Sequence, residues 1–139
     1  MTTGGAVPSD KEGAEEYQPT ILVVEDIEAT RLFMVLCLSQ EGYRVLAAGT
    51  AHDALAMFQQ PFSTIDVVLL DVHLYRERSD VLIAECHAQI PPVPVVLVTG
   101  SADVTQDGLS EADAILPKPF ELGELLTTVS RLARVHAHR

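Results

Sequence analysis

Short, unbroken apolar runs separated by longer helical stretches are the feature that most constrains the fold of this chain. Three of these runs read ILVV, VVLL and VVLV, at residues 21–24, 67–70 and 95–98. A strand that is apolar on both faces is typical of a parallel sheet covered by helices on both sides. The alternation of such strands with helical stretches is typical of βαβ units. From residue 20 onward the sequence therefore predicts an α/β fold with a doubly wound, five-stranded parallel sheet.

The expected elements follow one another with short connections. Strands are expected at residues 21–25, 44–48, 66–70, 93–98 and 114–116. Helices are expected at residues 28–40, 51–59, 81–89 and 122–133. A further, fourth helix near 102–107 is expected to be short or irregular, because this segment has few apolar residues and is followed by Gly108. Gly42 is predicted to end the first helix and Thr50 to cap the second.

The charge balance argues against nucleic acid as a partner. The 139 residues include 9 basic and 20 acidic ones, which gives a net charge of -11. Binding to phosphate backbones needs clustered Lys and Arg, and this chain has only two lysines, Lys11 and Lys118. The length is that of one domain, and the 47% apolar content can supply its core without disulfides.

The ends of the chain differ in composition from its middle. Residues 1–18 are rich in Gly, Pro, Ser, Thr and acidic residues, and are expected to form a disordered acidic tail. Residues 19–135 are expected to form one domain, and 136–139 a frayed C-terminus. The longest apolar run, 32–38, is far shorter than the roughly 18 residues of a membrane span, and no secretory signal is visible. We therefore expect a cytoplasmic protein without a membrane segment.

Polar side chains follow the carboxyl ends of the predicted strands. They are Glu25 and Asp26, Asp71, Thr99 and Lys118, after the first, third, fourth and fifth strand. Because functional groups of open parallel sheets collect at this edge, we expect these five side chains to converge. The other aspartates, Asp53, Asp66 and Asp80, are expected to be helix caps or solvated charges.

Three neighbouring carboxylates need a cation. Two unit charges 4 Å apart repel by about 4 kcal/mol at an effective dielectric constant of about 20. Mg²⁺ is bound by one or two carboxylates together with water and phosphate oxygens, and Lys118 would supply a second positive charge. An aspartate held between a metal ion and a lysine can accept a phosphoryl group as an acyl phosphate. We therefore predict that an aspartate at this edge can accept a phosphoryl group, that Mg²⁺ is the cofactor, and that Thr99 donates a hydrogen bond to a phosphate oxygen.

Four motifs, LVVED, VVLLD, VLVTG and LPKPF, occur in this order, and with them the chain resembles the receiver domain of two-component response regulators over roughly residues 19–135. The resemblance implies the CheY-like, flavodoxin-like fold with strand order 2-1-3-4-5. It implies that Asp71 is the phosphoacceptor, Thr99 the switch hydroxyl and Lys118 the phosphate-binding lysine. The implied Mg²⁺ ligands are Asp26, Glu25 through water, Asp71 and the backbone carbonyl of His73. A cis Lys118–Pro119 peptide bond is also implied.

The same resemblance implies a function in a phosphorelay. A histidine kinase or a histidine phosphotransfer protein would phosphorylate Asp71, and this would change contacts with a downstream protein target, a homodimer being one such contact. The only reactions would then be self-catalysed phosphotransfer to Asp71 and hydrolysis of the resulting acyl phosphate, so the protein is not expected to be an enzyme. No output domain follows in this sequence, which favours a stand-alone receiver. The first helix, apolar almost all round at residues 32–38, is expected either to dock the histidine-bearing partner or to be deeply buried.

Two features depart from the family pattern. Ile115 stands where the family has an aromatic switch residue, so coupling between Thr99 and an aromatic ring is not expected. The loop after Asp71 is also different: His73 is expected to overhang the phosphate and tune its hydrolysis, while Arg76 and Arg78 either pair with the phosphate or are solvated. These departures keep open a degenerate receiver that acts only as a binding module. A haloacid-dehalogenase-type phosphatase is disfavoured, because its DxD motif is missing.

Overall fold

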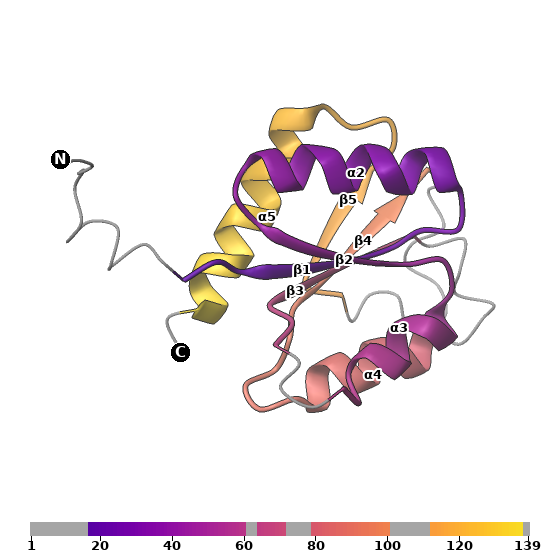
Figure 1. Cartoon of the computed structure of the whole chain (residues 1–139), viewed down its shortest axis with the longest axis vertical. Coiled ribbons are helices and arrows are strands. Elements are labelled where there is room, and N and C mark those ends of the chain that lie inside the picture. The colour runs from indigo at the N-terminus through magenta and orange to yellow at the C-terminus, as the bar shows by residue number, and fades with distance from the viewer. Residues whose placement is uncertain (1–16, 61–63, 72–78, 101–111, 138–139) are drawn as a thin grey trace, which may run out of the picture.

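A five-stranded parallel sheet forms the centre of the computed structural model, which describes residues 17–60, 64–71, 79–100 and 112–137 (Figure 1). The strands are β1 (Thr20–Val24), β2 (Arg44–Ala48), β3 (Val67–Asp71), β4 (Val95–Thr99) and β5 (Ala114–Pro117). They lie in the order β2-β1-β3-β4-β5, and every neighbouring pair is parallel. This order confirms the predicted CheY-like topology.

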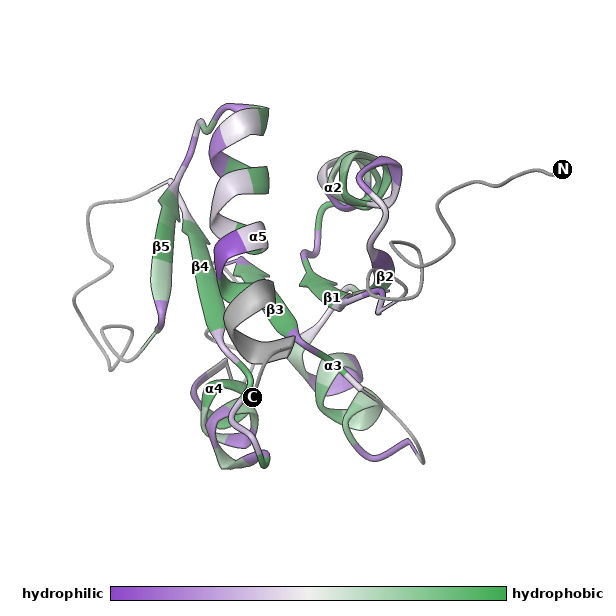
Figure 2. Cartoon of the chain, turned by 90° about the vertical axis from the view of Figure 1, so that its left-hand side faces the viewer, coloured by the Kyte–Doolittle hydropathy of each residue, from purple (hydrophilic) through white to green (hydrophobic). Residues whose placement is uncertain are grey.

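Helices cover both faces of the sheet. They are α2 (Glu28–Gln40), α3 (Ala51–Met57), α4 (Ser79–Ala88) and α5 (Leu122–Ala137). α2 and α5 lie on one face, and α3 and α4 lie on the other (Figures 1 and 2). Successive strand residues alternate between the two cores, as a period of two requires: Ile21 packs with α2 and α5, whereas Leu22 packs with α3 and α4. All five residues of β1, β3 and β4 are buried, which explains their continuous apolar sequences.

The observed bounds agree with the prediction for α2 and β2 and differ by a few residues elsewhere. β4 begins two residues later than expected because the Val93 N–H donates to the Cys86 carbonyl of α4, at 2.8 Å, instead of joining the sheet. The next residue, Pro94, has no N–H to give. The expected short helix near 102–107 lies outside the described residues.

The predicted turn signals have the expected geometry. Gly42 has a φ of 96°, a backbone conformation that favours glycine after a helix. The Thr50 Oγ1 accepts a hydrogen bond of 3.0 Å from the Asp53 N–H and so caps α3. The Lys118–Pro119 peptide bond is cis, as predicted.

Helix α2 is buried on one side only. Met34 and Leu38 face the core, whereas Leu32, Phe33 and Leu36 are 53%, 52% and 61% exposed. The alternative of a deeply buried helix is therefore wrong, and α2 carries an exposed apolar strip. Within the described residues no helix combines the length and the hydropathy that crossing a bilayer demands.

The prediction of a solvated or capping Asp66 is also wrong. Asp66 lies directly before β3, is 1% exposed, and accepts hydrogen bonds from the Tyr17 hydroxyl at 2.6 Å and the Thr20 N–H at 2.8 Å. Gln18 donates to the Gly42 carbonyl at 2.8 Å. Burial, and then the hydrogen bond to Asp66, raise the pKa of Tyr17 to about 12. Tyr17 and Gln18, which composition grouped with the N-terminal tail, are thus hydrogen-bonded to the domain.

Candidate functional site

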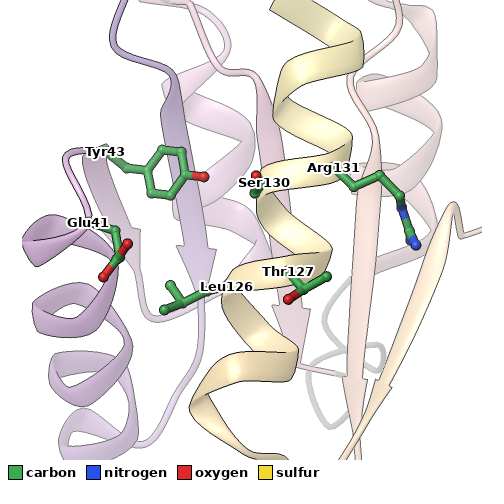
Figure 3. Close-up of a pocket in the computed structure, with 6 residues that line it drawn as sticks. All are labelled: Glu41, Tyr43, Leu126, Thr127, Ser130 and Arg131. Atoms are coloured by element: carbon green, nitrogen blue, oxygen red, sulfur yellow. The ribbon is translucent and has the colours of Figure 1, made fainter.

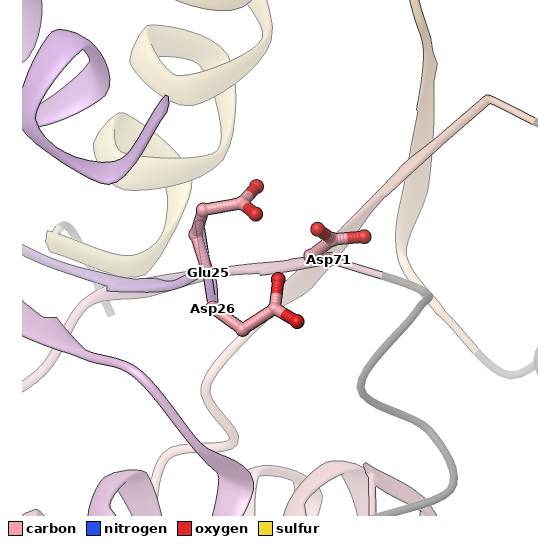
Figure 4. Close-up of side chains that lie close together, drawn as sticks. All are labelled: Glu25, Asp26 and Asp71. Atoms are coloured by element: carbon pink, nitrogen blue, oxygen red, sulfur yellow. The ribbon is translucent and has the colours of Figure 1, made fainter. Parts of the chain in front are cut away.

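Three carboxylates meet at the carboxyl edge of the sheet. Glu25 and Asp26 follow β1, and Asp71 is the last residue of β3. Glu25 and Asp71 are each 1% exposed, whereas Asp26 is exposed. One carboxylate oxygen from each residue lies within 4.8 Å of the other two, and the three side chains point toward a common centre (Figure 4). The parallel register of β1 and β3 is what brings these acids together across 46 positions of sequence.

Lys118 supplies a positive charge to this acidic cluster. Its Nζ lies 3.4 Å from Asp71 Oδ2 and 3.7 Å from Glu25 Oε1. The lysine follows β5, and its backbone N–H donates to the carbonyl of Thr99 at the end of β4. Thr99 itself is 3% exposed. All five residues that the sequence placed at this edge therefore lie there in the structure.

The electrostatics of the cluster are unfavourable when no further cation is present. Burial raises the pKa of Glu25 to about 7, and the neighbouring carboxyl of Asp71 raises it as well. The Ile27 N–H and the Lys118 ammonium act in the opposite direction. Buried charges are costly unless they are paired, so the folded chain holds this pair of acids at the expense of stability.

A divalent cation with oxygen ligands fits this arrangement. Among the described residues three acids face one ammonium, which leaves two negative charges in excess when all three acids are ionised. Glu25 Oε1 is buried and has no hydrogen-bond partner among the described residues, so it is available as a ligand. Ligand oxygens of an octahedral Mg²⁺ ion lie about 2.9 to 4.2 Å apart, and the three carboxylate oxygens all lie within 4.8 Å of one another. Glu25, Asp26 and Asp71 would thus hold the ion.

Arg31, which the sequence analysis did not single out, contacts the turn that carries two of these acids. Its Nη1 donates to the Glu25 carbonyl at 2.8 Å, and its backbone N–H donates to the Ile27 carbonyl at 2.9 Å. The only sequence signal is its place, five residues after Asp26, on the first turns of α2. Sequence cannot show that this side chain turns back toward the strand.

A cavity of about 510 Å³ lies elsewhere, between α5 and the start of β2 (Figure 3). Tyr43 and Leu126 give it an apolar wall, and Glu41, Thr127, Ser130 and Arg131 complete its lining. Tyr43 directly precedes β2, so the cavity is at the amino edge of the sheet. The acidic cluster at the carboxyl edge is therefore a separate site.

Other predicted residues lie away from the cluster or outside the described residues. Ile115, in β5, is 45% exposed and presents an aliphatic side chain to solvent. His73, Arg76 and Arg78 belong to the segment 72–78, which is outside the described residues.

The two cysteines are free thiols: Cys37 is partly buried and Cys86 is fully buried. Burial raises the pKa of Cys86 to about 12.

Comparison with known proteins agrees with this geometry. The sequence model described as "Response regulator receiver domain" matches residues 21–130. The chain is 33% identical to the sensor kinase CckA of Brucella abortus over 81% of its length, and 33% identical to the transcriptional regulatory protein PmrA of Pectobacterium parmentieri over 82%. It spans 12% and 52% of these two relatives, which are longer proteins.

Solved structures show the same fold. A CheY-like receiver domain protein from Methanospirillum hungatei is 26% identical, with a TM-score of 0.77 over 88% of this chain and 98% of that one. The response regulator TrrA from Thermotoga maritima, solved in complex with Mg²⁺ and BeF, is 27% identical, with a TM-score of 0.72 over 83% of this chain and 99% of that one.

Receiver domains are the phosphoaccepting signalling modules of two-component systems and bind Mg²⁺ at an acidic site. The family match covers most of the described fold, and the acidic cluster lies at the edge of the sheet where that site is expected. The chain therefore belongs to the response regulator receiver domain family.

Proposed function

We propose that Asp71 is the phosphoacceptor of a phosphorelay and that a histidine kinase or a histidine phosphotransfer protein supplies the phosphoryl group. The observation that carries this proposal is the surroundings of Asp71. It is buried at the end of β3, with Lys118 3.4 Å from its Oδ2 and two further carboxylates beside it. Phosphorylation would then alter contacts with a downstream protein.

The transfer is a displacement at phosphorus. A carboxylate oxygen of Asp71 attacks the phosphorus of a phosphohistidine, the P–N bond breaks, and the imidazole leaves with the electron pair. The product is an acyl phosphate on Asp71, which water later hydrolyses. When bound, Mg²⁺ supplies positive charge next to the phosphoryl oxygens. Glu25 and Asp26 would hold it together with Asp71, and the backbone carbonyl of His73 would be a further ligand.

Lys118 and Thr99 would bind the transferred group. The Lys118 ammonium, already beside the Asp71 carboxylate, offsets the negative charge that the phosphoryl oxygens bring. The Thr99 hydroxyl would donate to a phosphate oxygen and act as the switch. Because Ile115 cannot take the place of an aromatic ring, we propose that the output of this switch does not depend on aromatic reorientation. We further propose that His73 tunes the hydrolysis of the acyl phosphate.

The exposed strip on α2 supports docking of a histidine-bearing partner. Ile27, Leu32, Phe33 and Leu36 are all more than half exposed. Ile27, the N-cap residue of α2, directly follows Asp26 and is exposed at the end of the helix beside the acidic cluster. A helical partner lying along it would bring its phosphohistidine next to the acidic cluster.

Phosphorylation by a small donor tests the proposal directly. The protein is incubated with Mg²⁺ and acetyl phosphate, and the added mass is measured on the intact chain. We expect one phosphoryl group on the wild type, none on Asp71→Ala, and one on Asp53→Ala, which removes an exposed acid of α3. Equal labelling of wild type and Asp71→Ala, or no labelling at all, would leave a degenerate receiver that acts as a binding module.

Docking has its own test. Phe33→Glu should slow phosphotransfer from a phosphorylated histidine protein at least tenfold and leave labelling by acetyl phosphate unchanged. Ile90→Glu alters a side chain that is 98% exposed in the loop after α4 and serves as the control. Equal transfer rates for the two variants would exclude the α2 strip as the docking surface.

A further inference from the structure

Four hydrogen bonds among the described residues hold the turn that carries Glu25 and Asp26. The Glu25 N–H donates to the Ala48 carbonyl at 3.0 Å, and the Ile27 N–H donates to Glu25 Oε2 at 3.2 Å. Arg31 makes the other two, from its Nη1 to the Glu25 carbonyl and from its N–H to the Ile27 carbonyl. Asp26 lies between these anchored peptides. Its side chain is exposed, and Ile27, the N-cap residue of α2, gives no side-chain cap.

The guanidinium of Arg31 occupies a restricted position. A Cβ added at Gly49, in the connection between β2 and α3, would lie 3.3 Å from Nη1. This contact is tighter than an ordinary van der Waals contact, so an alanine there would have to displace the guanidinium by a few tenths of an ångström. Gly49 thus leaves the space in which Arg31 reaches the Glu25 carbonyl.

From this geometry we propose that Arg31 is a positioning residue for the cation site: its side chain fixes the turn between β1 and α2 so that Glu25 and Asp26 face Asp71. This inference rests on the proposed function, because it assumes that these acids bind Mg²⁺. A ligand set that is held in place before the ion arrives loses less freedom on binding.

The sign of the effect separates positioning from charge. If the guanidinium acted only through its positive charge, its removal would tighten Mg²⁺ binding, because one cation would no longer repel another. If it acts by holding the turn, its removal weakens Mg²⁺ binding, as the loss of partners that orient metal ligands does.

The experiment measures the dissociation constant of Mg²⁺ from the thermal midpoint at a series of Mg²⁺ concentrations. We expect Arg31→Met to raise this constant about tenfold. Arg31→Lys keeps the charge but loses the planar donor fork, and Gly49→Ala keeps the arginine but displaces it; each should raise the constant about threefold. Arg44→Met removes an equal charge from the exposed start of β2 and should leave the constant within about twofold of wild type.

A second readout separates positioning from general damage to the fold. At saturating Mg²⁺, Arg31→Met should be labelled by acetyl phosphate within about twofold of the wild-type rate, because the ion is then in place. Mg²⁺ binding by Arg31→Met that equals or exceeds that of wild type would overturn the inference. If Arg31→Met does not fold, Gly49→Ala provides the test. A Mg²⁺ dissociation constant unchanged from wild type in Gly49→Ala would then overturn the inference.

The two proposals have distinguishable outcomes. Wild type that binds no Mg²⁺ and takes no phosphoryl group on Asp71 would remove the proposed function and this inference together. Wild type that does both, with Arg31→Met binding Mg²⁺ as tightly, would remove this inference alone.

Discussion

Two buried aspartates stand at the two ends of one strand, and their surroundings are opposite in kind. Asp66 precedes β3 and Asp71 ends it, and each is 1% exposed. Asp66 accepts hydrogen bonds from the Tyr17 hydroxyl and the Thr20 N–H. Asp71 instead lies beside two other acids and one ammonium.

The difference shows how burial of an acid is to be interpreted. A buried carboxylate whose oxygens are met by donors from the chain contributes to the fold, because its lost hydration is replaced. A buried acid among other acids lowers stability until a cation balances it, and Glu25 Oε1, which has no hydrogen-bond partner within the described part of the chain, belongs to that second environment. At the amino edge of the sheet, Asp66 therefore stabilises the fold. At the carboxyl edge, the acids would be stabilised by a bound cation.

The largest expected effect is on the chemistry of the carboxyl edge. Lys118→Met should slow labelling of Asp71 by acetyl phosphate about 100-fold or more, because it removes the positive charge that offsets the phosphoryl oxygens. Lys118→Arg restores the charge and should recover part of the rate. The rate is measured from the mass of the intact chain over time. Labelling of Lys118→Met at the wild-type rate would show that the ammonium contributes only to the fold.

The next effect concerns stability and should be opposite at the two ends of β3. Asp66→Ala should lower the free energy of unfolding by about 3 kcal/mol, because the buried Thr20 N–H loses its acceptor and Tyr17 its partner. Asp71→Ala should leave that free energy unchanged or raise it, because one of three repelling carboxylates is gone. Urea unfolding in Mg²⁺-free buffer measures both. Equal destabilisation by the two variants would show that Asp66 and Asp71 contribute alike to stability, contrary to this prediction.

Mg²⁺ should stabilise the carboxyl edge only. At a concentration ten times its dissociation constant, Mg²⁺ should raise the free energy of unfolding by about 1.4 kcal/mol, and a chelator should reverse this. In Asp26→Asn, Mg²⁺ should cause little of this rise in the free energy of unfolding. In Asp66→Asn, Mg²⁺ should cause the full rise, although this variant is less stable than wild type. Thermal unfolding with and without Mg²⁺ checks this. An increment that disappears in Asp66→Asn would mean that the two edges are not independent.

The smallest effect is at Tyr17. Tyr17→Phe should lower the free energy of unfolding by about 1 kcal/mol at neutral pH, the usual contribution of one hydrogen bond. The folded pKa of about 12 lies above the ordinary value of 10.0. The contribution of the phenol is therefore fully present below pH 10 and is lost as the pH rises through about 12.

Urea unfolding at a series of alkaline pH values follows this loss, which should be absent in Tyr17→Phe. Tyr43→Phe, which removes a hydroxyl elsewhere, is the control. A wild-type profile that matches the Tyr17→Phe profile would contradict the raised pKa.

Much of the fold and of the acidic cluster could be predicted from the sequence. Continuous apolar runs identified β1, β3 and β4, because a strand covered on both faces can carry few polar side chains. Since parallel strands end at one edge, the polar residues that follow them had to lie near one another. Glu25, Asp71 and Lys118 meet for this reason.

Residues whose partners come from distant segments could not be predicted in the same way. Asp66 looked like a solvated charge because nothing near it in sequence shows that Tyr17, 49 positions earlier, donates to it. Beyond its place near Asp26, Arg31 gave no signal, because its contact is with a backbone carbonyl and every residue has one. The space left by Gly49 depends on how β2 lies beside β1.

The sequence by itself determined the order of elements, the strands that are buried on both faces and the edge at which the charged residues collect, because these follow from local hydrophobic period and chain direction. Only the tertiary structure decided what surrounds each buried aspartate: a hydroxyl and a backbone donor at Asp66, and two further acids with one ammonium at Asp71. That distinction depends on individual donors within about 3 Å, and such distances are set by the packing of segments that are far apart in the chain. It separates Asp66, which holds the N-terminal residues to the sheet, from Asp71, which lies among acids that a cation would balance.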